Sequence, residues 1–165
     1  MNGEHSAKLV LCVLFEYDYG RMDRGPSVDR RWFFEELSQT GVQTAPFWWD
    51  RWVDDQTGLQ EALLKCISDV NPDLVLFVPH RDQFSIKLLD EVRARVPTIA
   101  WFGDDQWRFS DFSRVFAPHF SHVVTTDPFS VPDYLSIGIV PIVSDWASEL
   151  LEEETPPVEY DPEFN

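Results

Sequence analysis

The chain has 165 residues, which predicts one domain with a hydrophobic core, and hydrophobic residues make up 44% of it, which argues against a largely disordered chain. Its 29 acidic and 13 basic residues give a formal net charge of -16, so the chain repels phosphate backbones and we expect no nucleic-acid partner. No apolar run reaches the roughly 18 residues of a membrane-spanning helix, so we expect no membrane span.

The two cysteines and the C-terminal charges bear on location and domain boundaries. Cys12 and Cys66 lack CxxC spacing and fall in apolar patterns, which suits a reducing compartment. The opening residues MNGEHSAK do not resemble an export signal, so we expect a cytoplasmic location. No Lys or Arg follows residue 144. We predict one domain over residues 1–144 and an acidic linker or tail over residues 145–165, leading toward a missing second domain.

Strand and helix patterns alternate along the chain. Apolar patterns predict strands over residues 8–15, 42–49, 73–79, 98–102, 122–126 and 139–143. The first is a continuous apolar run, typical of a strand buried on both faces, whereas Pro46 in the second indicates an edge, a strand end or a bulge. Apolar residues at steps of three and four predict helices between them, and the helix over residues 59–70 is the clearest. This alternation predicts the fold class: an α/β, Rossmann-like three-layer α/β/α domain with about six mostly parallel strands.

A long polar loop follows the first predicted strand, and loops of this length are often functional. Its glycines allow close backbone approach, its arginines are suited to an anionic group, and Ser27 is a plausible N-cap of the next helix. The spacing matches neither GxGxxG nor a phosphate-binding loop, so an ordinary surface loop explains it equally well. The candidate substrate-binding residues here are Tyr19, Gly20, Arg21, Gly25 and Ser27.

The polar loop after the fourth predicted strand, Gly103 to Arg108, is the place where we expect chemistry, because ligands of parallel sheets bind outside the carboxyl ends of the strands. Asp104 and Asp105 are suited to a general base or a hydroxyl-binding carboxylate. A plainer alternative is that Asp104 caps the following turn and Asp105 pairs with Arg108. Trp107 and Arg108 are candidate substrate-binding residues.

His80 ends the third predicted strand and is a further candidate for substrate binding, although a lone His at a strand end is more often structural. We predict no metal site, because the Asp104–Asp105 pair has no third ligand and a strand begins between His119 and His122. Trp49 and Trp52 would join Trp107 in a stacking wall, or simply pack in the core. No nucleophile motif surrounds any serine.

Three segments together resemble the N-terminal half of the CgeB-like (spore maturation protein) glycosyltransferases: YGRMDRGPSVDRRWFFEEL, NPDLVLFV and TIAWFGDDQWRFSDFSRVFAPHFSHVVTTDP. The resemblance runs from about residue 9 to residue 142. It implies a GT-B enzyme, in which two Rossmann-like domains face each other across a cleft. The N-terminal domain would shape the acceptor site, and the C-terminal domain would bind the nucleotide sugar. The resemblance implies no cofactor, the nucleotide sugar being a co-substrate.

We therefore expect a domain that takes part in sugar transfer from a nucleotide sugar to the hydroxyl of a glycan or small molecule. It would be inactive without a donor-binding half, supplied by a C-terminal domain or a partner chain. Asp104 or Asp105 would hold or deprotonate the acceptor, and the loop from Gly20 to Ser27 would line the cleft. The alternative is a non-catalytic Rossmann-like domain that binds a saccharide or a protein partner.

Overall fold

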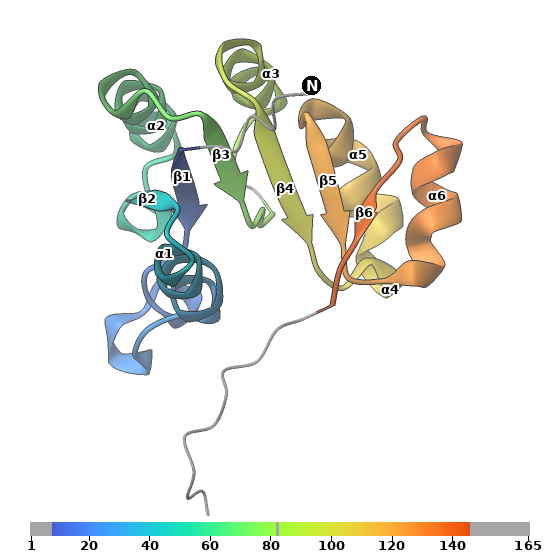
Figure 1. The fold of residues 1–165 in the computed structure, drawn as a ribbon, viewed down its shortest axis with the longest axis horizontal. Coiled ribbons are helices and arrows are strands. Elements are labelled where there is room, and N and C mark those ends of the chain that lie inside the picture. Colours follow the sequence, from blue (N-terminus) through green and yellow to red (C-terminus); the bar gives the residue numbers. More distant parts are fainter. Residues whose placement is uncertain (1–7, 82, 146–165) are drawn as a thin grey trace, which may run out of the picture.

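A computed structural model describes residues 8–81 and 83–145, so the predicted acidic stretch lies outside the described residues except for Asp145. Six parallel strands form one sheet in the order β2-β1-β3-β4-β5-β6 (Figure 1). The predicted Rossmann-like α/β class is therefore confirmed. The strands are β1 (Leu9–Leu14), β2 (Gln43–Trp48), β3 (Leu74–Phe77), β4 (Thr98–Phe102), β5 (His122–Thr125) and β6 (Ile142–Val143).

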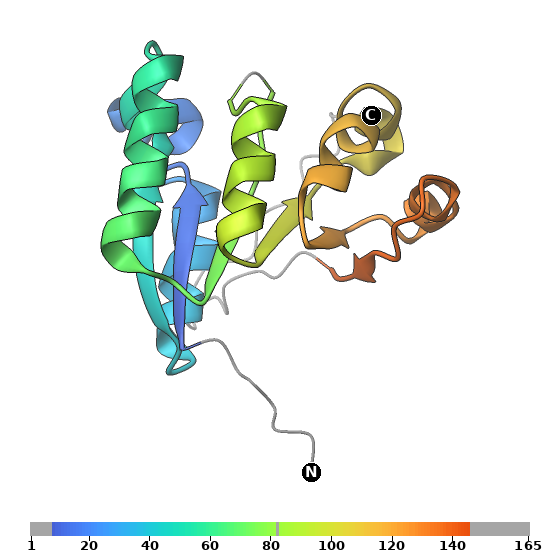
Figure 2. The ribbon, with the colours of Figure 1, turned by 90° about the horizontal axis from the view of Figure 1, so that it is seen from above.

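The strand order explains how the helices are distributed over the two faces. The chain steps from β1 to β2 in one direction, then passes back over β1 to β3 and continues to β6 in the other. Because such crossovers are right-handed, the first helix covers one face and the later helices cover the opposite face, as Figure 2 shows for the row formed by α2, α3 and α5. The helices are α1 (Glu36–Gln39), α2 (Gln56–Val70), α3 (Ile86–Arg95), α4 (Asp105–Arg108), α5 (Arg114–Phe116) and α6 (Val131–Ser136).

Shorter helical segments extend these helices or connect them to strands. The π-helical segments η3 (Arg30–Glu35) and η5 (Phe109–Ser113) run directly into α1 and α5. The 3-10 segments are η1 (Asp18–Gly20), η2 (Met22–Arg24), η4 (Trp49–Trp52), η6 (Ala117–His119) and η7 (Pro128–Ser130). No helix in the described part of the chain is both long and apolar enough to cross a membrane.

Successive side chains along a strand point to opposite faces of the sheet, so a hydrophobic core forms on each face. Leu11 and Val13 of β1 point to the larger core, which α2, α3 and the η5 segment cover. Cys12 lies between them in sequence and points to the smaller core, beneath Phe33 of η3 and Leu37 of α1. Both faces of β1 are thus buried, as its continuous apolar sequence predicts.

The structure corrects two of the predicted elements. The segment from Gly103 to Arg108 is wrong as a loop, because α4 already begins at Asp105. Asp104 has a left-handed backbone with φ of 62°, which turns the chain sharply enough for the helix to start within two residues of β4. The sixth strand pairs with β5 only over Ile142–Val143, at the edge of the sheet.

The strand order also marks the expected binding edge. The direction of winding reverses between β1 and β3, and in open α/β sheets ligands bind outside the carboxyl ends of the strands at such a switch point. Loops after β1, β3, β4 and β5 all lie at this edge. Every candidate site residue named from the sequence follows one of the first three of these strands.

Candidate functional site

The predicted site residues form two neighbouring groups on the carboxyl edge of the sheet. One group follows β1 and β3 and contains the first loop and His80; the other follows β4 and contains Asp104 to Arg108. Arg81, next to His80, connects the two groups, since its guanidinium donates to the carboxylate of Asp111 in η5 at 2.6 Å.

The first loop is closed by its own backbone. The N–H of Asp18 donates to the carbonyl of Gly25 at 3.0 Å, and Gly20 and Gly25 both have positive φ, as the loop requires. A Cβ at Gly20 would lie 3.3 Å from the Cβ of Asp50, so a larger residue is disfavoured there. The side chains of Tyr19 and Arg21 project into solvent, where Arg21 pairs with Asp23 at 2.8 Å. The loop therefore presents side chains to solvent rather than forming an anion cradle.

Ser27 serves the structure of this region. Its hydroxyl donates to the carbonyl of Phe15 at 2.6 Å and accepts from the N–H of Arg30 at 2.9 Å. The predicted helix cap is thus present, and it ties the helix start to the end of β1. A serine has a single O–H to donate, so in this arrangement none is left for a ligand.

Asp105 is buried and its carboxylate is held by three hydroxyl donors. The hydroxyls of Ser113, Thr125 and Tyr134 donate to it at 2.5, 2.5 and 2.8 Å. These donors come from η5, β5 and α6, so one carboxylate joins three elements that are distant in sequence. Burial, followed by the charge and hydrogen bond of Asp105, raises the pKa of Tyr134 far above its ordinary value.

Neither part of the plainer alternative for this aspartate pair is found. The side chain of Asp104 makes no cap hydrogen bond, although Asp104 stands at the cap position of α4 and is exposed. The guanidinium of Arg108 lies 4.3 Å from the ring centre of Phe112 and forms no salt bridge with Asp105 in the described part of the chain. Burial lowers the pKa of Arg108, with nearby carboxylates opposing that shift.

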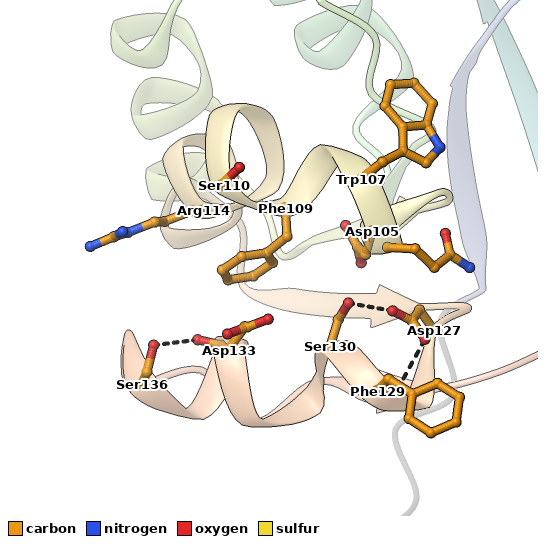
Figure 3. Close-up of a pocket in the computed structure, with 11 residues that line it drawn as sticks. Asp105, Trp107, Phe109, Ser110, Arg114, Asp127, Phe129, Ser130, Asp133 and Ser136 are labelled. Atoms are coloured by element: carbon orange, nitrogen blue, oxygen red, sulfur yellow. Dashed lines mark hydrogen bonds between the residues drawn. The ribbon is translucent and has the colours of Figure 1, made fainter.

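A cavity of about 620 Å³ lies beside Asp105, within the size range of small-molecule sites. Figure 3 shows two walls, one from α4, η5 and α5 and the other from η7 and α6. Exposed aromatic rings stand on both walls, Trp107 with 67% and Phe129 with 88% of their surface accessible. The lining residues are Asp105, Gln106, Trp107, Phe109, Ser110, Arg114, Asp127, Phe129, Ser130, Asp133 and Ser136.

The second wall was missed by the sequence analysis. In the sequence, Asp127 followed by Pro128 is typical of a helix start, and the cap is present, since Asp127 accepts from the N–H of Phe129 at 3.0 Å. The signal in the sequence is the close spacing of Asp127, Phe129 and Asp133, while the exposure of Phe129 is known only from the structure.

The two other tryptophans of the expected stacking wall, Trp49 and Trp52, belong to the larger core. Trp49 is buried against Phe15 at a ring distance of 4.1 Å, and Trp52 stacks on Phe47 at 5.0 Å. They do not form a wall with Trp107, because packing in the larger core holds them. Within residues 8–81 and 83–145, no group of three or more His, Cys, Asp or Glu side chains is arranged to hold a metal ion.

The fold and the cavity together define a Rossmann-like α/β domain with a polar, aromatic-rimmed cavity at the carboxyl edge of its sheet. Scans against protein-family models and against curated proteins find no match to this sequence.

Proposed function

We propose that this domain is the acceptor-side half of a cytoplasmic, CgeB-like GT-B glycosyltransferase. In this proposal a nucleotide sugar, held by a second domain or partner chain, gives its sugar to a hydroxyl of a glycan or small molecule bound here. The two free cysteines, Cys12 and Cys66, fit a reducing compartment. The sequence resemblance supplies the family, and the all-parallel sheet is compatible with it.

The cavity beside Asp105 is the observation that carries the proposal. Saccharides present apolar ring faces and many hydroxyl donors, and this cavity offers exposed aromatic rings together with carboxylates. Trp107 would stack on a sugar face, while Asp127 and Asp133 would accept from sugar hydroxyls. Both Asp127 oxygens already accept one hydrogen bond each, which holds the carboxylate in place and leaves lone pairs free.

The two predicted catalytic carboxylates take different parts in this proposal. Asp104 is exposed at the start of α4 and would hold an acceptor hydroxyl directly. Asp105 is enclosed by three hydroxyl donors and would keep the wall of the cavity in shape.

Sugar transfer is the direct test. The full-length product of the gene should transfer labelled sugar from at least one nucleotide sugar to an oligosaccharide, and we expect the transfer to need the donor-binding half. Saturable saccharide binding with no transfer from any nucleotide sugar would instead support a non-catalytic saccharide-binding domain. The fully engaged carboxylate of Asp105 is the observation that favours this second candidate.

Replacing Trp107 by Ala should weaken saccharide binding about tenfold, because an aromatic contact contributes roughly 0.5–1.5 kcal/mol beyond its buried area. Isothermal titration calorimetry with soluble oligosaccharides measures this change. Tyr19→Ala is the matched control, since Tyr19 is equally exposed on the same edge but does not line the cavity. Loss of binding in Tyr19→Ala, with none in Trp107→Ala, would place the saccharide on the first loop instead.

A further inference from the structure

Three buried nitrogen atoms in the segments that follow β2 and β3, at the carboxyl edge of the sheet, have no hydrogen-bond partner among the described residues. They are Nε1 of Trp49, Nε2 of His80 and Nε2 of Gln83. The three side chains are neighbours: the rings of Trp49 and His80 lie 5.8 Å apart, and Oε1 of Gln83 accepts from the N–H of His80 at 2.9 Å. Unsatisfied buried groups of this kind cost about 1–3 kcal/mol each, so their clustering at one place points to a function.

The imidazole ring of His80 has its Nε2 atom buried and its Nδ1 atom on the solvent-accessible edge. It packs edge-on against Phe15 at 4.6 Å and against Trp49, which fixes its plane. The side chain is 36% exposed although Nε2 is buried. Nδ1 has no hydrogen bond in the described part of the chain and is not among the buried unpaired atoms, so it lies on the accessible edge.

Asp29 stands on the inner side of this ring. Its Oδ2 lies 3.8 Å from Nε2 of His80 and accepts from the N–H of Phe15 at 3.3 Å. The carboxylate is mostly buried, and His80 is the single basic side chain within ion-pair distance of it among the described residues. A separation of 3.8 Å is longer than a hydrogen bond, but such contacts are often long in unliganded sites and shorten when a ligand binds.

The other charged side chains that the structure describes near the His80 ring already have partners. Glu16, after β1, is bound by Arg51 at 2.9 Å and faces Arg30 at 4.0 Å. Asp50 of η4 accepts from the N–H groups of Glu16 and Tyr17 at 3.0 and 3.2 Å. Arg81 is turned toward Asp111. Among the residues that the structure describes, Asp29 is therefore the carboxylate that remains available to His80.

We propose that His80, positioned by Asp29, is the residue that accepts the proton of the acceptor hydroxyl, an inference that rests on the proposed sugar transfer. A proton on Nε2 faces Asp29, and this leaves the lone pair of Nδ1 on the accessible edge. The reversal of winding between β1 and β3 places this nitrogen at the switch point of the sheet. The next residue, Arg81, pairs with Asp111 of η5, the segment whose Phe109 and Ser110 line the cavity.

The reaction then balances as follows. The hydroxyl proton moves to Nδ1 of His80 while the hydroxyl oxygen forms a bond to the anomeric carbon of the nucleotide sugar. The bond from that carbon to the phosphate oxygen breaks, and its electron pair leaves with the nucleoside diphosphate. Asp29 stabilises the imidazolium, which afterwards releases its proton to water.

Nitrogen-15 spectra of the imidazole rings test the positioning by Asp29 without any assay of transfer. At about pH 8.5, where an ordinary imidazole is neutral, we expect His80 to carry its proton on Nε2. Asp29→Leu should raise the share of the Nδ1–H form, because it removes the carboxylate oxygen that favours a proton on Nε2. An unchanged tautomer in a folded Asp29→Leu protein overturns the positioning role.

Transfer kinetics of the full-length product test the catalytic role. His80→Gln should lower kcat by about 10²–10⁴-fold with KM within about threefold, the usual contribution of general base catalysis. His119→Gln is the matched control, because His119 also faces a carboxylate, Asp90, at 2.7 Å but lies at the end of the sheet where β5 begins. Full activity in His80→Gln overturns the role of His80 and leaves intact the proposed sugar transfer to an acceptor in the cavity beside Asp105. Absence of transfer in the wild-type product overturns both.

Discussion

The Asp105→Asn protein is expected to lose about 2–4 kcal/mol of its free energy of unfolding, a large share of the stability of a domain this size. The carboxylate accepts from Ser113, Thr125 and Tyr134, all three of them completely buried. An amide keeps one oxygen but presents two N–H donors to the remaining hydroxyls. At least one hydroxyl is then left without an acceptor, and a buried polar group without a partner costs about 1–3 kcal/mol.

Urea denaturation followed by tryptophan fluorescence measures this loss. Asp104→Asn is the matched control, since it makes the same chemical change one residue earlier on an exposed side chain with positive φ. Asparagine tolerates that backbone well, so the control should stay within about 0.5 kcal/mol of the wild type. Equal stabilities of the two variants would mean that the three hydroxyls do not depend on Asp105.

The pair also separates structure from catalysis. A folded Asp104→Asn protein that loses sugar transfer would support a direct role for Asp104, whereas loss of activity in Asp105→Asn has to be corrected for loss of folded protein. For this reason Asp104, rather than its buried neighbour, is the more informative position for activity measurements.

The sheet was predictable because its signals are local. The apolar run of β4 predicts its bounds at Thr98–Phe102 exactly as observed, and the caps at Ser27 and Asp127 follow from side chains that bond to backbone two or three residues away. Each of these features needs only a few consecutive residues. The strand order was not predictable in this way, because it depends on which side of β1 the later strands pack.

The network around Asp105 was beyond the reach of pattern analysis for the same reason. Ser113 is eight residues from Asp105, and the two side chains meet because α4 continues into η5. Thr125 and Tyr134 are 20 and 29 residues away and are brought in by the packing of β5 and α6. A sequence with two adjacent aspartates after Gly103 looks like an exposed polar loop, and only tertiary structure shows that one of them is enclosed.

The contact between His80 and Asp29 depends both on local sequence patterns and on tertiary packing. Its place at the end of β3 could be predicted from the strand pattern, but its partner Asp29 lies 51 positions earlier, in the first turn after Ser27. A carboxylate in the first turn of a helix is favoured by the helix dipole, which is a local feature, and the structure adds that this carboxylate faces an imidazole. Crossover geometry, which brings the ends of β1 and β3 together, creates that contact.

Alkaline conditions should destabilise this protein mainly through Cys12. Burial raises the pKa of its thiol from 9.0 to about 12, so the folded state holds this proton more tightly than the unfolded chain does. The resulting stabilisation is complete below the unfolded value and is lost as the pH rises through the folded value. Over that window of about three pH units the free energy of unfolding should fall by about 4 kcal/mol from this group alone.

Tyr134 acts with the same sign at higher pH. Its pKa is raised above the ordinary value of 10.0, first by burial and then by Asp105, so its contribution begins to fade above about pH 10. Tyr134→Phe removes this part of the pH dependence and also one hydrogen bond to Asp105, at a cost of about 1–2 kcal/mol near neutral pH.

Urea titrations at about pH 8, 9.5 and 11 compare the wild type with Cys12→Ala, in which the group that titrates is gone. Cys12→Ala should be less stable than the wild type by about 1–2 kcal/mol at the lowest pH, because a core side chain has been shortened, and should lose less stability as the pH rises. Cys66→Ala is the control: its thiol is only partly buried and the variant keeps Cys12, so its pH dependence should stay close to that of the wild type. Parallel pH profiles for Cys12→Ala and the wild type would show that the buried thiol does not control alkaline unfolding, and that the charge on the lysines and tyrosines elsewhere does.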